Sequence, residues 1–277
     1  MSELAGKKIT FVGAGSIADS LVKGMTQTGV ASPSSIYVTN RSNTMRRQKM
    51  ADTYHVQAAD LQEALDGAHV IFLCMKPKDT AQAIQSLSEI GPRDALYISV
   101  IAGYSTSWLE SALSAALNAG SVKVIRAMPN TSSSVQQSAT GYCLGSNCKE
   151  EDARVVESLL RSVGKTYPVP EHLINAVTGL AGSGPAYIYY MVECMAQAGV
   201  AEGLDADLAQ DLAIQTLIGA ATMLSSGDES PAYLRERVTS PAGTTAAGLA
   251  ALDEHGFPTA LREAVRKASI RASELGK

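Results

Sequence analysis

A glycine-rich turn near the start of the chain carries the first residues whose spacing points to chemistry. The segment from Gly13 to Ala18 follows a short apolar run, and a helical pattern of apolar residues begins inside it. This order of strand, turn and helix predicts a dinucleotide-binding unit with a G-x-G-x-x-A fingerprint. We expect Gly13 to allow the tight turn, Gly15 to let a pyrophosphate approach, and Ser16 and Ile17 to open the helix toward it. The alternative is an ordinary turn with incidental glycines.

The end of the second predicted strand bears on which nucleotide is bound. An acidic residue that would accept hydrogen bonds from the adenosine ribose is absent, and the position reads Asn40, Arg41, Ser42. Arg46 and Arg47 follow one turn later. A planar guanidinium beside a hydroxyl suits a ribose 2′-phosphate, so we predict NADPH as the cofactor, with NADH possible but weaker. Alternatively, Asn40 and Ser42 cap the next helix, and both interpretations can hold together.

Two further segments follow predicted strands at the sheet edge where open α/β sheets bind ligands. Met75, Lys76 and Pro77 end one strand, so they are candidates for the cofactor pocket, although Lys76 can also be a solvated loop lysine. Another strand runs into Met128-Pro129-Asn130-Thr131. There Asn130 is a candidate for the nicotinamide carboxamide, for orienting the loop, or for a simple turn after proline.

Hydroxyl groups cluster late in the chain, in the stretch from Ser240 to Leu249. Ser240, Gly243, Thr244 and Thr245 precede or open a predicted helix. Such a helix start offers N–H groups and hydroxyls to a small carboxylate. Simple helix capping is the alternative. An earlier motif, Gly182 to Tyr187, also reads as the start of a helix, with its proline in the first turn.

The helices and strands predicted to position these residues change at Pro168 from an alternating pattern to helices alone. Before it, short apolar runs alternate with helical patterns, which predicts a parallel sheet covered by helices. The predicted strands are 9–12, 35–39, 70–75, 95–100, 123–127, 139–144 and 164–168, and the helices are 16–28, 44–53, 61–65, 80–88, 107–116 and 150–163. After it only helices are predicted, over 174–181, 185–198, 206–225, 231–238, 244–254 and 258–275. We therefore predict an α/β chain with a mostly parallel, Rossmann-type sheet domain in residues 1–168 and an all-α domain in residues 169–277.

Within the second domain, the segment from Leu208 to Leu224 is more apolar than a small domain can bury alone. It is expected to be a central buried helix or to pack against a partner subunit.

Bulk composition excludes several classes of function. The 277 residues are 45% hydrophobic and 18% charged, and the net charge of −4 argues against binding nucleic acid. No apolar run is long enough to span a membrane, and the first strand begins too early to leave room for a signal peptide, so a cytoplasmic protein is expected. The four cysteines are expected to be reduced thiols, although disulfides are possible, and the four histidines lack metal-ligand spacing.

Taken together, the motifs resemble those of the pyrroline-5-carboxylate reductase family along essentially the whole chain. The segments that carry the resemblance are 13–18, 40–42, 76–77, 128–131, 182–187 and 238–253. Three positions depart from the usual family pattern: Ser132 replaces a common proline, Ala242 a common glycine, and His69 a common acidic residue.

The resemblance implies a fold, an activity and roles for particular residues. It implies a Rossmann domain, a helical domain that interleaves with that of a second subunit, and homodimers that can assemble into rings. The implied reaction is NADPH-dependent reduction of 1-pyrroline-5-carboxylate to L-proline, with no metal. Thr245 is the candidate for holding the ring nitrogen, and Ser240, Gly243 and Thr244 are the candidates for the substrate carboxylate.

Two other functions are compatible with this architecture. One is an NADP-dependent reductase of the β-hydroxyacid dehydrogenase type, although the catalytic lysine motif of that class is not found after Pro168. The other is a nucleotide-sensing protein without catalysis, which would have no need for the hydroxyls at Ser240, Thr244 and Thr245.

Overall fold

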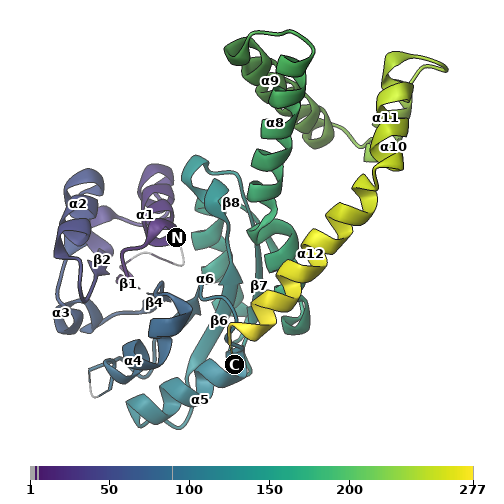
Figure 1. Cartoon of the computed structure of the whole chain (residues 1–277). Helices are drawn as coiled ribbons and strands as arrows, with labels where there is room; N and C mark the ends of the chain where they lie inside the picture. The colour runs from purple at the N-terminus through teal and green to yellow at the C-terminus, as the bar shows by residue number, and fades with distance from the viewer. Residues whose placement is uncertain (1–3, 5, 89, 277) are drawn as a thin grey trace. The chain divides into compact units, whose positions relative to one another are not determined.

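The computed structural model describes residue 4 and residues 6–88 and 90–276. Within them, one mixed sheet of eight strands runs in the order β3-β2-β1-β4-β5-β6-β7-β8. Figure 1 shows this sheet with the helices beside it. The strands are β1 (Ile9–Val12), β2 (Ile36–Thr39), β3 (Gln57–Ala58), β4 (Val70–Leu73), β5 (Leu96–Ser99), β6 (Lys123–Met128), β7 (Ser138–Leu144) and β8 (Gly164–Pro168). Neighbouring strands are parallel except β6 and β7, which confirms the predicted mostly parallel sheet.

The strand order reverses direction at β1. The chain builds outward from β1 to β2 and β3, then returns to place β4 on the other side of β1. Val12 at the end of β1 lies level with Thr39 of β2 and Leu73 of β4. Consequently, the loops that leave these three strands meet at one point of the carboxyl edge, where ligands of doubly wound sheets bind.

Helices cover both faces of the sheet because their apolar residues recur every three or four positions. On one face, α1 (Ser16–Thr28) buries Ala18, Leu21, Val22 and Met25 in a core shared with α2 (Thr44–Tyr54) and α6 (Glu150–Leu160). The other core contains residues of α3 (Leu61–Leu65), α4 (Thr80–Gln85) and α5 (Thr106–Leu117).

Short helical turns connect several of these elements. They are η1 (Pro33–Ser35), η2 (Pro77–Asp79), η3 (Thr131–Val135), η4 (Arg161–Val163) and η5 (Glu171–Leu173). After η5 come α7 (Ile174–Val177) and a π-helical turn, η6 (Thr178–Gly182).

Some predicted elements differ from the structure. Strand β3 was not predicted, because two residues are too short for an alternating pattern. The strand predicted over 70–75 ends at Leu73, and η2 begins at Pro77 shortly after it. The helix predicted over 174–181 is α-helical only to Val177 and then widens, with the Ser183 N–H donating to the Thr178 carbonyl over 2.8 Å. The helix predicted over 80–88 ends at Gln85, and residues 161–163 form a tighter final turn.

A second compact unit, from Gly184 to Arg266, is helical. It contains α8 (Gly184–Ala201), α9 (Ala206–Ser226), α10 (Pro231–Arg237), α11 (Thr244–Glu254) and the first half of α12 (Phe257–Glu274). Helices α8 and α9 pack closely where Gly199 faces Ala209. The predicted all-α character of the late chain is confirmed, since no strand lies among the described residues after Pro168.

The compact units and the predicted domains divide the chain at different places. Prediction placed the boundary at residue 168, where the strands end, whereas the sheet unit extends to Ser183 and also takes the chain from Lys267 onward. It extends to Ser183 because Ile174 of α7 is fully buried against Met128 and Cys143 of the sheet. At the far end of the chain, the backbone of Gly276 lies directly against that of Gly103.

Candidate cofactor and substrate sites

The glycine-rich turn lies at the point where the strand order reverses. Its backbone is tied to β2, because the Gly13 N–H donates to the Thr39 carbonyl over 2.9 Å. It is also packed against the end of β4, since the Cys74 carbonyl lies beside both Gly13 and Gly15. The three loops that were predicted to hold the nucleotide therefore meet here.

The two glycines of the turn serve different purposes. Gly13 has a φ of +112°, and a side chain there would place its Cβ 2.8 Å from the Cys74 carbonyl oxygen. The fold itself therefore requires a glycine at position 13. Gly15 has an ordinary φ of −76°, and its hypothetical Cβ would lie 3.7 Å from its nearest neighbour, a normal contact. The fold would therefore tolerate a side chain at position 15. The absence of one leaves a bare backbone surface that fits a bound pyrophosphate.

The start of α1 is open for an anion. Gly15 is the N-cap and supplies no side-chain acceptor for the first N–H groups of the helix. Ser16 is exposed, while Ile17 is half-buried and packs against the core. Unpaired N–H groups and the positive end of the helix dipole make this a favourable place for phosphate.

The turn between β2 and α2 is shaped by its asparagines. Asn40 accepts hydrogen bonds from the N–H groups of Ser42 (3.2 Å) and Asn43 (2.9 Å) through its side-chain oxygen. The alternative prediction that Asn40 and Ser42 cap α2 is wrong, because the N-cap is Asn43, which accepts from the Arg46 N–H. Arg41 and Ser42 are exposed, and within the described residues neither side chain has a hydrogen-bond or ion-pair partner. Both are therefore available to a ligand.

Replacing Arg41 by alanine is expected to weaken NADPH binding about 10- to 150-fold, because a charge-assisted contact typically contributes ~1.5–3 kcal/mol. NADH affinity should stay within about twofold, since NADH has no 2′-phosphate to lose that contact. Isothermal titration with both nucleotides measures this. Lys165→Ala, which removes an exposed cation from β8 at the far end of the sheet, is the control. Equal losses for NADPH and NADH would assign Arg41 a structural role.

The segment Met75-Lys76-Pro77 passes beside the glycine-rich turn. The Met75 N–H would lie 3.3 Å from a Cβ on Gly13, and the Met75 side chain packs against the second core. Lys76 is exposed and precedes η2, which starts at Pro77. The Tyr104 hydroxyl donates to the Pro77 carbonyl over 3.1 Å and fastens this loop to the one after β5.

Both polar atoms of the Asn130 side-chain amide form hydrogen bonds within the protein. The side-chain NH₂ group donates to the Ala181 carbonyl over 2.9 Å, and the side-chain oxygen accepts from the Ser132 N–H over 3.0 Å. The contact with Ala181 joins the segment after β6 to the π-helical turn, and the contact with Ser132 orders the loop itself. Of the interpretations offered by the sequence, the structure favours loop orientation over contact with nicotinamide.

A buried polar cluster beside β6 was missed in the sequence analysis. Arg126 is 3% exposed, its Nη2 donates to the Asn175 side chain over 3.0 Å, and its Nη1 lies 3.8 Å from Glu171. Glu171 accepts from the N–H and hydroxyl of Thr106, both over 2.6 Å, at the start of α5. Burial lowers the pKa of the Arg126 guanidinium. One signal was present in the sequence, namely an arginine among the apolar residues that follow Lys123 in this strand.

The hydroxyl-rich loop lies in the helical unit. The Gly243 N–H donates to the Ser240 carbonyl over 3.0 Å, which closes a turn, and Gly243 is then the N-cap of α11 without a side-chain acceptor. Ser240 and Thr244 are exposed, whereas Thr245 is half-buried. The turn thus leaves the first N–H groups of an 11-residue helix beside two exposed hydroxyls, an arrangement suited to a carboxylate.

Ala242, in the middle of this loop, has a strained backbone. Its φ of +58° lies in the left-handed region that glycine adopts without steric cost. A glycine at this position would adopt the same conformation without that cost. The loop nevertheless forms with alanine, because the closing hydrogen bond between Ser240 and Gly243 is retained.

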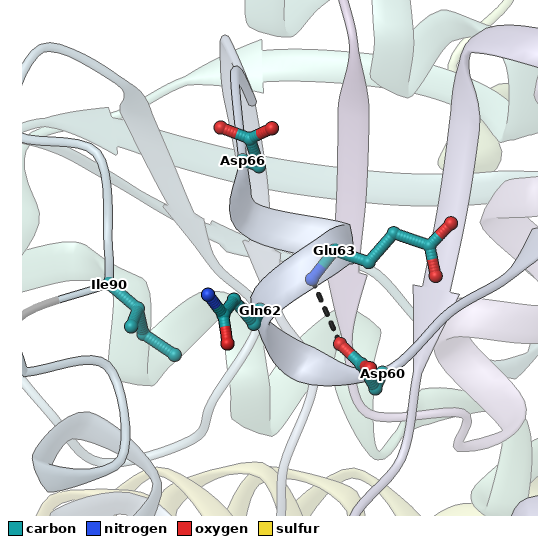
Figure 2. Close-up of a pocket in the computed structure, with 5 residues that line it drawn as sticks. All are labelled: Asp60, Gln62, Glu63, Asp66 and Ile90. Carbon is teal, nitrogen blue, oxygen red and sulfur yellow. Dashed lines mark hydrogen bonds between the residues drawn. The ribbon is translucent and has the colours of Figure 1, made fainter.

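A hollow lies beside α3 (Figure 2). It is lined by Asp60, Gln62, Glu63, Asp66 and Ile90. Asp60 caps the helix by accepting from the Glu63 N–H over 2.9 Å. The acidic lining is unfavourable for a phosphate-bearing ligand, and none of these residues was a predicted site residue.

Comparisons with known proteins agree with this arrangement. Residues 171–275 match the family model described as pyrroline-5-carboxylate reductase dimerisation, and residues 8–103 match the one described as NADP oxidoreductase, coenzyme F420-dependent. Pyrroline-5-carboxylate reductase 1 of Bacillus subtilis is 41% identical over 98% of this chain and 90% of its own. This chain belongs to the pyrroline-5-carboxylate reductase family. The predicted family is thereby confirmed.

Solved structures of pyrroline-5-carboxylate reductases have the same fold. That of the Coxiella burnetii reductase superposes with a TM-score of 0.88 at 33% identity, covering 98% of this chain and 99% of its own. The Plasmodium falciparum enzyme, whose structure has NADP bound, has a TM-score of 0.86 at 24% identity, over 98% and 99% of the two chains. The predicted fold class is confirmed. The predicted use of a nicotinamide cofactor agrees with the NADP oxidoreductase family model that residues 8–103 match.

Other features of the described residues concern metals, membranes and cysteines. Among the residues that the structure describes, no group of three or more histidine, cysteine or acidic side chains is arranged to hold a metal ion, and none of the helices is long and apolar enough to cross a membrane. The four cysteines are unpaired in this family member. Burial raises the pKa of Cys143 to about 12 and that of Cys148 to about 11, so both are protonated thiols at neutral pH.

Proposed function

We propose that this protein reduces 1-pyrroline-5-carboxylate to L-proline with NADPH, the last step of proline biosynthesis. The observation that carries the proposal is the similarity to a pyrroline-5-carboxylate reductase over almost the whole chain. That extent takes in both the glycine-rich turn and the hydroxyl-rich loop. NADPH is preferred over NADH in this proposal because Arg41 and Ser42 occupy the position where an NAD-binding protein has an acidic residue.

The substrate needs little chemical activation. Its cyclic imine is basic enough to be protonated to a large extent near neutral pH, and the iminium is an electrophile. Bound NADPH supplies the hydride. The chain's own tasks are to hold the two reactants in register, to place charges and to exclude water.

The proposed cofactor residues belong to the glycine-rich turn, the start of α1 and the segments that follow β2, β4 and β6. Ser16 and Ile17 present the start of α1 to the pyrophosphate across the bare surface of Gly15. The proposed group also includes Gly13, Asn40, Arg41, Ser42, Met75, Lys76, Pro77 and Asn130. Of these, Gly13 and Asn40 set the backbone conformation of their own turns. Asn130 orders the loop after β6 through its hydrogen bonds with Ser132 and Ala181.

The proposed substrate residues belong to the loop that opens α11. Ser240 and Thr244 provide exposed hydroxyls for the carboxylate, and Thr245 provides a hydroxyl for the ring nitrogen. Gly243 uses its own N–H within the turn, so its contribution is the close backbone approach that leaves the helix start uncovered.

A decrease in NADPH absorbance on addition of 1-pyrroline-5-carboxylate tests the proposal. The same assay with NADH gives the cofactor preference. Nucleotide binding without turnover would support the sensing alternative. Oxidation of a β-hydroxyacid by NADP⁺, with no reaction of the imine, would support the β-hydroxyacid dehydrogenase alternative.

We also propose that the protein forms a homodimer through its C-terminal helices and that these dimers assemble into a ring. The proposed location is the cytoplasm. Large apolar side chains of α9 are exposed within a single chain, namely Leu208, Leu212, Ile214, Ile218, Met223 and Leu224, each between 39% and 55%. Two positions were expected for this helix. The prediction that it is a central helix buried within one chain is therefore wrong. The partner-subunit alternative agrees with the matched dimerisation family.

Light scattering at micromolar concentration is expected to give at least twice the chain mass of 29.0 kDa, because a monomer with so much exposed apolar surface would be poorly soluble. Leu212→Glu should shift the mass toward that of the monomer, since it places a charge in the apolar face. Lys49→Glu on α2 of the sheet unit is the control and should leave the mass unchanged. A parent mass of 29 kDa would contradict the dimer.

A further inference from the structure

Arg46 joins the two turns that the proposed cofactor site uses. Its backbone N–H is fixed by the Asn43 side chain over 2.8 Å at the start of α2. Its guanidinium Nη2 crosses to α1 and donates to the Ser16 hydroxyl over 3.3 Å. We propose that Arg46, oriented by Ser16, is a second specificity-determining residue that binds the 2′-phosphate of NADPH together with Arg41.

The position of this guanidinium is electrostatically unfavourable without an anion. Ser16 is the first residue of α1, so Arg46 places a positive charge beside the positive end of a helix dipole. Within the described residues Arg46 has no carboxylate partner, and the acid of that helical turn, Asp19, accepts a hydrogen bond from the Tyr54 hydroxyl instead. A phosphate group bound here would compensate both the guanidinium and the helix.

The neighbouring arginine is not equivalent. Arg47 is half-buried, and its Nη1 donates to the Ala59 carbonyl over 2.6 Å, which ties α2 to the chain after β3. Arg46 is exposed, and among the described residues its guanidinium is partnered by a hydroxyl on another helix. Arg47 is therefore a structural residue, whereas Arg46 has donors left for a ligand.

The hydrogen bond from the Arg46 N–H to the Asn43 side chain places the Arg46 backbone near the adenosine end of the proposed cofactor site. Asn43, which holds its backbone, directly follows the Arg41-Ser42 pair. A phosphate at that pair would meet Arg41 from its own turn and Arg46 from the first turn of α2. The pyrophosphate has the N–H groups of α1 and needs no guanidinium. An unexpected consequence is that Ser16, although it lies on the pyrophosphate turn, affects discrimination between NADPH and NADH.

Binding measurements on the full-length protein test this inference, which rests on the proposed use of NADPH. Isothermal titration uses NADPH, NADH and adenosine 2′,5′-bisphosphate, a probe that carries the 2′-phosphate without nicotinamide. Arg46→Met should weaken NADPH and the probe by about tenfold or more, the range of a charge-assisted contact, and NADH by less than about twofold. Arg46→Lys should not restore the affinity, because an ammonium cannot contact Ser16 and a phosphate as a planar fork can.

A double-mutant cycle tests whether Ser16 affects NADPH binding directly or only by orienting Arg46. Ser16→Ala should weaken NADPH by about threefold, a fraction of the effect of losing the guanidinium, and should add nothing to Arg46→Met. Lys49→Met, which removes another exposed cation from α2, is the control, and thermal unfolding verifies that every variant is folded.

Each other outcome contradicts a specific part of the account. Unchanged NADPH affinity in Arg46→Met, or equal losses for NADPH and NADH, would overturn the assignment to the 2′-phosphate. Additive losses in the cycle would overturn the orienting role of Ser16. A parent protein that bound neither nucleotide would overturn the proposed function itself, which is a different failure.

Discussion

Gly15→Val is expected to lower NADPH affinity by more than about 100-fold, or roughly 2.8 kcal/mol, while the protein remains folded. The backbone of Gly15 has an ordinary φ of −76°, and a Cβ at this position would lie 3.7 Å from its nearest neighbour. The chain can therefore accept a side chain here, but a branched one would occupy the space proposed for the pyrophosphate. Isothermal titration and thermal unfolding together measure the two parts of the prediction.

The other glycine of the turn provides a matched contrast. Gly13→Ala should destabilise the fold, because it combines a φ of +112° with a Cβ 2.8 Å from the Cys74 carbonyl oxygen. Gly15→Ala should leave thermal stability nearly unchanged and weaken NADPH less than valine does. If Gly15→Val bound NADPH like the parent, the glycine-rich turn would not be the pyrophosphate site.

Thr245→Ala is expected to lower turnover about 5- to 150-fold, the equivalent of one oriented hydrogen bond of ~1–3 kcal/mol. NADPH affinity should change much less, because the hydroxyl is proposed to contact the substrate nitrogen. The loss should not be complete, since the iminium is electrophilic without help and hydride transfer depends mainly on positioning. Steady-state kinetics with varied imine and varied NADPH separate these effects.

Thr245→Ser is the matched variant, because it keeps the hydroxyl and removes only a methyl group. Much of the parent activity should return in it. Parent-like kinetics in both the alanine and the serine variants would make Thr245 a residue of the helix start only. The substrate nitrogen would then have to be held elsewhere.

Local patterns were sufficient to predict most of the sheet unit. The change from an apolar run to a 3.6-residue pattern at Gly13–Gly15 located both β1 and α1 with the observed bounds. The same holds for α3 and β8. In these places short-range preference and burial agree, so the sequence pattern and the fold lead to the same element.

Contacts between distant segments were beyond the reach of sequence patterns. The link between Ser16 and Arg46 spans 30 residues, and that between Thr106 and Glu171 spans 65. Neither pair has a spacing that marks it, because each depends on how the strands are ordered in the sheet. The widening of the helix after Val177 was missed for a related reason, since it is accompanied by a long-range contact from Asn130 to Ala181.

Transfer of deuterium from labelled NADPH to product tests the central claim most directly. The parent protein is incubated with 1-pyrroline-5-carboxylate and NADPH carrying deuterium at the transferable C4 position, in separate reactions for the two stereoisomers. One of the two should give L-proline one mass unit heavier, with the deuterium at the ring carbon that was double-bonded to nitrogen. Absence of labelled proline with both, from folded protein that binds NADPH, would contradict the assignment as a pyrroline-5-carboxylate reductase.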